Sequence, residues 1–296
     1  MARRRAFPVV AIPAGLAAVG RIIAAILAYQ VLLIATSLVL YVAALRLVPV
    51  EAQSIFGMVA LGVAEGAAIL GVLFVWRVVD RRPVVEMGLR GQRALGKWLR
   101  GAGVAVLMMG FVVFTWYTLL AGAVWDMNPD LARATVVVVG GLLGYLVQGA
   151  SEEVLFRGHL FENVKDQWGP KWAVAVSSVA FGLFHAANPG FGVLPLINLV
   201  LFGVGAALYK VYVDEGQLWG VFGIHTVWNW LQQVVFGLPN SGMATTRDNA
   251  LFTVSPSSSL PDVVWGGGFG PEGTLATTLV LLALIWFCLR RARAAS

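Results

Sequence analysis

Residues 132–157 read ARATVVVVGGLLGYLVQGASEEVLFR, an apolar run that ends in two adjacent carboxylates, Glu152 and Glu153, and the guanidinium of Arg157. A charged side chain at the centre of a bilayer costs roughly 2.5–3.5 kcal/mol on insertion scales, and charges inside membrane segments usually mark functional sites. The stretch therefore predicts a membrane helix that carries an active site. The structural alternative is an ion pair at a helix end, with Glu152 reaching toward the membrane surface.

The composition of the chain supports a membrane setting. Of the 296 residues, 59% are hydrophobic and 12% are charged, whereas a soluble domain has about 25% charged residues. The apolar runs are long enough for helices rather than barrel strands. The single cysteine, Cys288, excludes an intrachain disulfide and any multi-cysteine metal site. The net charge of +6 is distributed over helix ends, which argues against a nucleic-acid partner.

The apolar segments predict an all-α polytopic membrane protein with about eight transmembrane helices. These helices are expected at residues 22–45, 55–76, 102–125, 132–165, 172–188, 194–213, 218–236 and 274–289. Three regions follow from this division. Residues 1–129 hold the first three helices and a basic loop at 77–100, residues 130–237 hold the next four helices and the candidate core, and residues 238–296 hold an extracytoplasmic loop and the last helix.

The distribution of basic residues predicts the orientation. Eight crossings place both termini on one side, and if that side is the cytoplasm it receives 18 of the 21 lysines and arginines, including Arg3, Arg4 and Arg5. An excess of Lys and Arg in cytoplasmic segments is the rule for membrane proteins. We therefore expect a multi-pass protein of the inner (plasma) membrane with cytoplasmic termini. The preference for arginine over lysine is typical of a GC-rich prokaryotic genome.

The polar end of the 132–157 stretch divides into two parts. Neighbouring residues on a helix point about 100° apart, so Glu152 and Glu153 lie on different faces. Glu153 and Arg157 are four residues apart with the acid first, the favourable order for an ion pair. Glu152 is left without a local counter-charge, which suits a carboxylate that transfers protons near neutral pH.

Two later motifs contribute the other candidate site residues. His185 ends the sequence FGLFH, and His225 begins HTVWN, which places Asn229 one turn later on the same helix face. The third histidine, His159, is expected near the membrane interface. A histidine within a membrane helix is a functional candidate, although many bond only to a backbone carbonyl.

A depth argument tests whether these residues can meet. If the inner boundary lies near Lys165, Lys171 and Glu215, then Glu152, His185 and Asn229 each lie roughly 20 Å from it at 1.5 Å per residue, and His225 roughly 15 Å. This common level requires the helix that contains Glu152 to continue past Arg157 to about Lys165. We therefore predict an unusually long helix there.

The three motifs together resemble those of the CPBP family (CAAX proteases and bacteriocin-processing enzymes, also called Abi), an intramembrane protease family that includes the Rce1-type CAAX prenyl endopeptidases. The motifs are Glu152-Glu153-x-x-x-Arg157, Phe181-x-x-x-His185 and His225-x-x-x-Asn229, within a similar region of roughly 130–237. Residues 266–273, GGGFGPEG, also resemble a stretch near the C-terminus of bacterial members.

The resemblance implies a mechanism and a class of substrate. Glu152 would be the general base, His185 would help to activate the attacking water, and His225 and Asn229 would bind the oxyanion, with Glu153 and Arg157 in support. The Rce1-type resemblance favours a metal-free glutamate mechanism with no cofactor; two Glu and two His could ligate zinc, which would need three of these side chains within about 2.0–2.2 Å of the metal. The implied partner is a peptide or membrane-protein substrate, either prenylated or a leader or bacteriocin peptide.

Other functions fit the motifs less well. The chain has no His-Glu-x-x-His helix and no Gly-x-Gly-Asp, and Gly149-Ala150-Ser151 resembles the rhomboid serine motif except that Glu152 replaces its second glycine. A non-proteolytic immunity or adaptor protein on the same scaffold remains open, as does a proton-coupled transporter, although no paired half-helix pattern is present. Glu65 either lines the cavity or pairs with another helix, and Asn188 and Asn198 are interpreted as turn residues.

Overall fold

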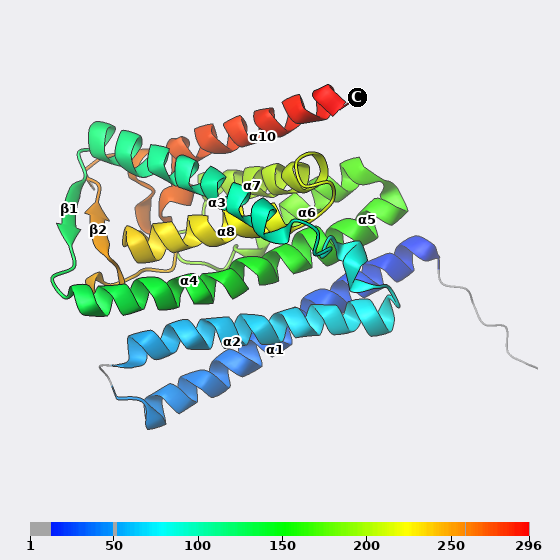
Figure 1. Ribbon diagram of the computed structural model, residues 1–296, viewed down its shortest axis with the longest axis horizontal. Coiled ribbons are helices and arrows are strands. Elements are labelled where there is room, and N and C mark those ends of the chain that lie inside the picture. The colour runs from blue at the N-terminus through cyan, green and yellow to red at the C-terminus, as the bar shows by residue number, and fades with distance from the viewer. Residues whose placement is uncertain (1–12, 50–51, 258, 296) are drawn as a thin grey trace, which may run out of the picture.

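The computed structural model describes residues 13–49, 52–257 and 259–295, which form a bundle of long helices with a small sheet at one end (Figure 1). Arg3, Arg4 and Arg5 lie outside the described residues. The longer helices are α1 (Ala14–Leu47), α2 (Gln53–Phe74), α3 (Ala94–Gly110), α4 (Leu131–Glu153), α5 (Phe161–Trp168), α6 (Pro170–Phe184), α7 (Val193–Tyr212), α8 (Trp219–Trp230) and α10 (Leu275–Ala295).

Shorter elements extend or connect these helices. Four π-helical segments continue them without a break: η2 (Val75–Val79) after α2, η4 (Phe111–Leu120) after α3, η5 (Val154–Leu160) between α4 and α5, and η6 (Leu231–Val235) after α8. The connections hold η3 (Val84–Met87), η7 (Arg247–Asn249), α9 (Asp262–Trp265), η8 (Gly267–Phe269) and η9 (Pro271–Gly273). Strands β1 (Val124–Met127) and β2 (Phe252–Ser255) pair in antiparallel register.

The prediction of an all-α polytopic membrane protein is confirmed. Within the described ranges, 6 helices are long and apolar enough to cross a membrane: α1, α2 with η2, α3 with η4, the run from α4 to α5, α7 and α10. Helices α6 and α8 are shorter, so the number of eight crossings stays a prediction. Helix α1 exposes Leu16, Leu38 and Tyr41, as expected for a face that contacts lipid.

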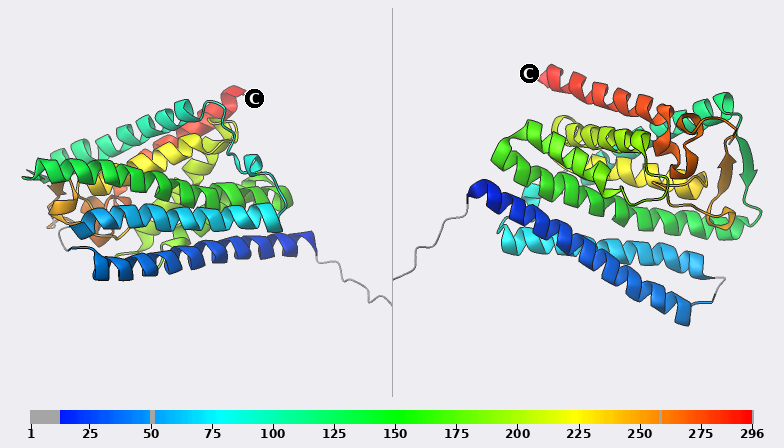
Figure 2. Two further views of the ribbon diagram at one scale, coloured as in Figure 1. Left: turned by 60° about the horizontal axis from the view of Figure 1, so that its bottom comes forward. Right: turned by 180° about the vertical axis from the view of Figure 1, so that it is seen from behind.

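Helix α8 occupies the middle of the bundle, where it packs against α3 on one side and α4 on the other (Figure 1). Helix α4 also contacts α2, which packs against α1, and these two helices form a layer along one flank (Figure 2). On the opposite flank, α7 packs against α6 and α10. The start of α1 and the end of α10 both lie away from the end that carries the sheet (Figure 1).

The contact between α3 and α8 depends on glycine. A Cβ atom added to Gly101 would lie 1.9 Å from the carbonyl oxygen of Gly220, so the two backbones touch. Small residues allow such close approach between membrane helices, where packing rather than the hydrophobic effect holds helices together. This contact fixes α8, and with it the third sequence motif, at the centre of the bundle.

The long helix predicted past Arg157 is confirmed, because α4, η5 and α5 form one continuous run that ends at Trp168. The side chain of Asp130 caps its beginning by accepting a hydrogen bond from the backbone N–H of Arg133 (3.0 Å). Gly169, with φ +87°, ends the run, and Pro170 begins α6.

Three boundaries differ from the prediction. Helix α3 begins at Ala94, inside the expected basic loop, because Lys97 is buried and its Nζ donates to the carbonyl of Asp214 (2.8 Å). Helix α6 ends at Phe184, so His185 follows the helix rather than lying within it. The expected loop at 238–273 contains β2, whose partner β1 lies at the expected end of the 102–125 helix.

Candidate active site

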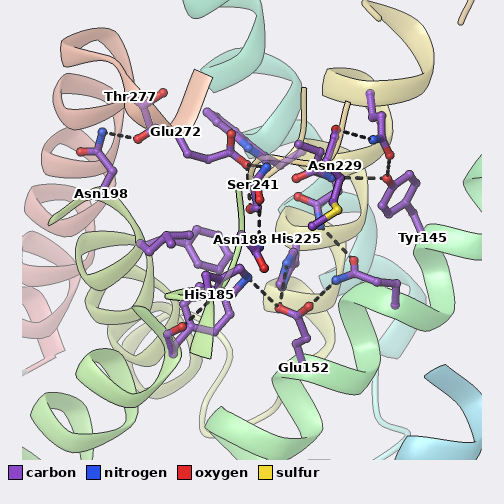
Figure 3. A pocket seen from close by; sticks show the side chains of 18 of the residues that line it. Tyr145, Glu152, His185, Asn188, Asn198, His225, Asn229, Ser241, Glu272 and Thr277 are labelled. Carbon is purple, nitrogen blue, oxygen red and sulfur yellow. Dashed lines mark hydrogen bonds and ion pairs between the residues drawn. The ribbon is translucent and has the colours of Figure 1, made fainter. Parts of the chain in front are cut away.

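A cavity of about 340 Å³ lies where α4, α6, α7 and α8 meet, and part of the segment between α8 and α10 contributes to its wall. Glu152, His185, His225 and Asn229 all line it (Figure 3). Glu152, His185 and Asn229, which were predicted to share one depth, therefore meet together with His225, although the four residues come from three helical regions. This outcome depends on the length of the α4–α5 run, which holds Glu152 well inside the bundle.

The two carboxylate oxygens of Glu152 have different surroundings. Its Oε1 accepts a hydrogen bond from Gln148 Nε2 (2.5 Å). Its Oε2 is buried and has no hydrogen-bond partner among the described residues, and it faces His225 Nε2 at 3.7 Å and His185 Nε2 at 4.0 Å. These last two distances are too long for direct hydrogen bonds but short enough for a bridging water.

The ring orientation of His185 follows from its backbone contact. His185 Nδ1 lies 2.9 Å from the carbonyl oxygen of Phe181. A carbonyl only accepts hydrogen bonds, so Nδ1 carries the proton and Nε2 of the neutral ring is an acceptor. Because Nε2 is directed toward Glu152, His185 presents a lone pair to the same point as the free carboxylate oxygen.

Glu153 and Arg157 form the predicted ion pair, with Arg157 Nη1 3.0 Å from Glu153 Oε1, and both side chains are fully buried. The guanidinium of Arg157 also lies over the ring of Phe181, 4.3 Å from its centroid. The same Glu153 oxygen lies 2.8 Å from His225 Nδ1. Glu153 therefore orients His225 so that its Nε2 points into the cavity.

Gln148 is a site residue that the sequence reasoning missed. Asn229 Nδ2 donates to Gln148 Oε1 (2.9 Å), while the amide of Gln148 donates to Glu152. Gln148 thus joins the first and third sequence motifs within the cavity. The available signal was its spacing, because an amide four residues before Glu152 lies on the same face of an apolar helix.

Residues 133–231 match the family model described as type II CAAX prenyl endopeptidase Rce1-like. The chain carries an Rce1-like domain. The family expected from the three motifs is therefore confirmed, and the match indicates a CAAX-type protease in a multi-pass membrane protein. No curated protein matches the sequence.

Beside Glu152, the Rce1-like domain is joined to the two N-terminal helices by a buried polar cluster. Glu65 of α2 accepts hydrogen bonds from the hydroxyls of Tyr29 in α1 and Ser151 in α4. Glu65 also lines the cavity. Both roles left open for Glu65 are thus present, and the cluster links the layer of α1 and α2 to the helix that carries Glu152.

Glu272, in η9, lines the cavity on the side away from Glu152 (Figure 3). Its carboxylate accepts hydrogen bonds from the backbone N–H of Ser241 (3.1 Å) and from Gln232 Nε2 (2.6 Å). Burial raises the pKa of Glu272 to about 7. Through these hydrogen bonds, Glu272 connects the segment that contains Ser241 to η6, the continuation of α8.

The interpretation of Asn188 and Asn198 as turn residues was incomplete. Asn188 Nδ2 donates to the carbonyl of Ser241 (2.8 Å), and Asn198 Nδ2 donates to the carbonyl of Glu272 (2.7 Å). Asn198 lies within α7, and both asparagines line the cavity. Their partners are more than 50 residues away in the sequence, so spacing alone gave no signal.

The side chain of His159, which was expected near the membrane interface, lies inside the protein. His159 is fully buried, and its Nε2 lies 2.8 Å from Asp80 Oδ2. Asp80 also pairs with Arg21 Nε at 2.8 Å. Asp80 follows η2 and Arg21 lies in α1, so His159 belongs to a polar cluster that joins the Rce1-like domain to the N-terminal helices.

The family resemblance leaves zinc possible but does not favour it. Among the described residues, no group of three His, Cys, Asp or Glu side chains is placed to hold a metal ion. Glu152, His185 and His225 come closest in kind: Glu153 lies at His225 Nδ1 and the Phe181 carbonyl lies at His185 Nδ1, so both Nε2 atoms face Glu152. A metal-free mechanism stays a prediction.

Proposed function

We propose that the chain is an intramembrane endopeptidase in which Glu152 and His185 activate a water molecule and His225 and Asn229 stabilise the oxyanion. The observation that carries this proposal is the free Glu152 Oε2, buried between two imidazole Nε2 atoms at 3.7 and 4.0 Å. A carboxylate placed in this way can accept a proton from a water that the cavity admits.

The acceptor pattern orients the attacking water. Both Glu152 Oε2 and His185 Nε2 are acceptors in the described tautomer, and they lie 4.0 Å apart. A water between them donates one O–H to each atom, so its lone pair is directed away from both, into the cavity. Attack on a peptide carbonyl there forms the new C–O bond while the water proton moves to Glu152.

The developing negative charge needs donors on the other side of the carbonyl. Asn229 Nδ2 supplies one N–H, and His225 Nε2 supplies a second when the ring is protonated. The C–N bond then breaks, and Glu152 returns the proton to the leaving amine.

The deciding experiment is Glu152→Gln, with Glu65→Gln as a matched carboxylate that lines the same cavity. In proteoliposomes, Glu152→Gln should lower cleavage by at least about 10²–10⁴-fold, the usual contribution of a general base, and Glu65→Gln should lower it far less. Prenylated CAAX-type peptides and unprenylated leader or bacteriocin peptides should both be assayed. Unchanged cleavage by the Glu152→Gln protein would refute the assignment.

A non-proteolytic immunity or adaptor role makes the opposite prediction. A Glu152→Ala, His185→Ala double variant would then keep full biological activity, whereas a protease would lose it. The transporter alternative predicts proton-coupled flux in liposomes. No contact in the cavity favours either alternative over peptide hydrolysis.

We also infer cytoplasmic termini in the inner (plasma) membrane. The end of the bundle away from the sheet holds the start of α1, helix α5 and the end of α10 (Figure 1), and the last turns of α5 and α10 carry the basic residues Lys165 and Arg293. A Cys288→Ser protein with a single new cysteine at Ser257 tests this inference. An impermeant thiol reagent added outside spheroplasts should label it, and labelling only after lysis would reverse the orientation.

A further inference from the structure

A second cavity of about 250 Å³ adjoins the first. Its walls come from Gly57 and Met58 of α2, from Gly141 and Gly144 of α4, and from the segment before and within η7, including Thr245. Leu61, Tyr145 and Gln233 line both cavities. The two spaces are therefore neighbours that share three side chains.

The partition between the cavities is made of hydrogen-bonded side chains. The Tyr145 hydroxyl donates to Gln233 Oε1, and Asn240 Nδ2 donates to the same hydroxyl (3.4 Å). Gln233 Nε2 donates to the carbonyl of Met243 (2.9 Å). Tyr145 stands at the edge of the first cavity, on the side away from His185 (Figure 3). Rotation of the Tyr145 and Gln233 side chains would join the two spaces.

The second cavity differs from the first in charge. The first is lined by Glu65, Glu152 and Glu272 and by two histidines. The described lining of the second includes no Asp, Glu, Lys, Arg or His side chain, but it offers the hydroxyls of Thr245 and Thr246 and the amides of Gln233 and Asn249. Such a lining suits uncharged side chains and the polar groups of a peptide backbone.

We propose that the second cavity binds the part of the substrate next to the scissile bond, as an extended stretch with uncharged side chains. This inference rests on the proposed function, since it places the scissile bond at Glu152. An extended chain advances about 3.3–3.6 Å per residue and can pass from one cavity to the other. A helix, about 10–12 Å across with its side chains, is too wide for this space.

Gly57 provides a way to fill the second cavity alone. A Cβ atom added at Gly57 would meet nothing within 4 Å, whereas one at Gly141 would lie 2.8 Å from Val234 Cγ2. Gly57→Leu therefore adds a side chain at the cavity wall, where its Cβ atom meets no neighbour. Gly20→Leu in α1 is the matched control, because a Cβ atom there also meets nothing within 4 Å and Gly20 lines neither cavity.

The experiment compares a short peptide that is cleaved by the wild-type protein with peptides extended by two or three uncharged residues on either side. The extension on the side that enters the second cavity should raise kcat/KM by about tenfold, the effect of burying one medium apolar side chain. Gly57→Leu should abolish this gain and leave cleavage of the short peptide within about twofold of wild type. An Asp or Lys residue in the extension should also abolish the gain in the wild-type protein, because the cavity offers no counter-charge. Gly20→Leu should keep the gain.

Two results would overturn the inference. The first is an equal loss of kcat/KM for the short and the extended peptides in the Gly57→Leu protein, which would mean that the cavity only supports packing or holds lipid. The second is an unchanged gain in Gly57→Leu. A binding readout separates this inference from the proposed function: a photoreactive residue in the extension should crosslink to 243–249 in the Glu152→Gln protein, and Gly57→Leu should prevent it. Wild-type protein that crosslinks but cleaves neither peptide would refute only the hydrolysis.

Discussion

His225 and His159 are both buried and both bonded to a carboxylate at 2.8 Å, yet they have different surroundings. The second nitrogen of His225 faces Glu152 across a cavity. The second nitrogen of His159 has no hydrogen-bond partner within the described chain, and His159 lines neither cavity. A buried histidine–carboxylate pair is therefore not a sign of catalysis by itself, because the space beside the free nitrogen decides what the ring can do.

The largest expected difference between the two histidines is in the cleavage rate. His225→Gln should lower kcat by about 10²–10³-fold, the usual effect of losing one oxyanion donor. His159→Gln should leave the rate of the folded protein within about twofold, because His159 does not reach the cavity. Cleavage in proteoliposomes, normalised to folded protein, measures both variants. Equal losses would show that the two sites work as one unit.

A smaller effect is expected at Gln148, which holds Glu152 and Asn229 together. Gln148→Leu should lower kcat by roughly tenfold with little change in KM, since a hydrogen bond to a charged group contributes about 1.5–3 kcal/mol. Steady-state kinetics at several substrate concentrations check this expectation. An increase in KM alone would make Gln148 a substrate-binding residue instead.

Substitution in the cluster of His159, Asp80 and Arg21 should change the stability of the protein rather than its cleavage rate. His159→Gln leaves Asp80 with Arg21 as its remaining ionic partner, and it should lower the free energy of unfolding by about 1–3 kcal/mol, the penalty for a buried polar group that loses a partner. Thermal denaturation in detergent compares it with His225→Gln. A wild-type melting temperature would show that the Asp80 cluster does not stabilise the helix junction.

The smallest effect on cleavage is expected at Asp214, which lies between α7 and α8 and lines neither cavity. Burial raises its pKa from 3.8 to about 6, although the backbone N–H of Gly220 and the nearby Lys97 and Arg100 oppose the shift. The contribution of Asp214 to stability is therefore full below about pH 4 and is lost as the pH rises through 6.

Asp214→Asn, which keeps an acceptor for Gly220, tests this dependence. The variant should lack the decline in melting temperature between about pH 4 and 6 that the wild-type protein shows. The nearby Glu215 and Tyr209 are the same in both proteins, so a difference in profile is assigned to Asp214. The same pH profile in both proteins would assign the decline to another group.

Much of the candidate site could be predicted because its chemistry lies in short sequence spacings. The pairing of Glu153 with Arg157 depends only on helix geometry, and the common depth of Glu152, His185 and Asn229 depends only on helix length. The length of the α4–α5 run could be predicted for the same reason, since Gly169 and Pro170 mark its end. The role of Glu272 could not, because its partners Gln232 and Ser241 are 40 and 31 residues away.

The sequence by itself determined that this is a helical membrane protein with an acidic pair and two histidine motifs, because hydrophobicity and helical spacing are local properties. Only the tertiary structure decided that His185 and His225 both face Glu152 Oε2, that Gln148 joins Glu152 to Asn229, and that a second cavity adjoins the first. These features depend on contacts between helices that are distant in the chain. Their positions follow from close packing, such as that of Gly101 against Gly220, which spacing along the sequence does not encode.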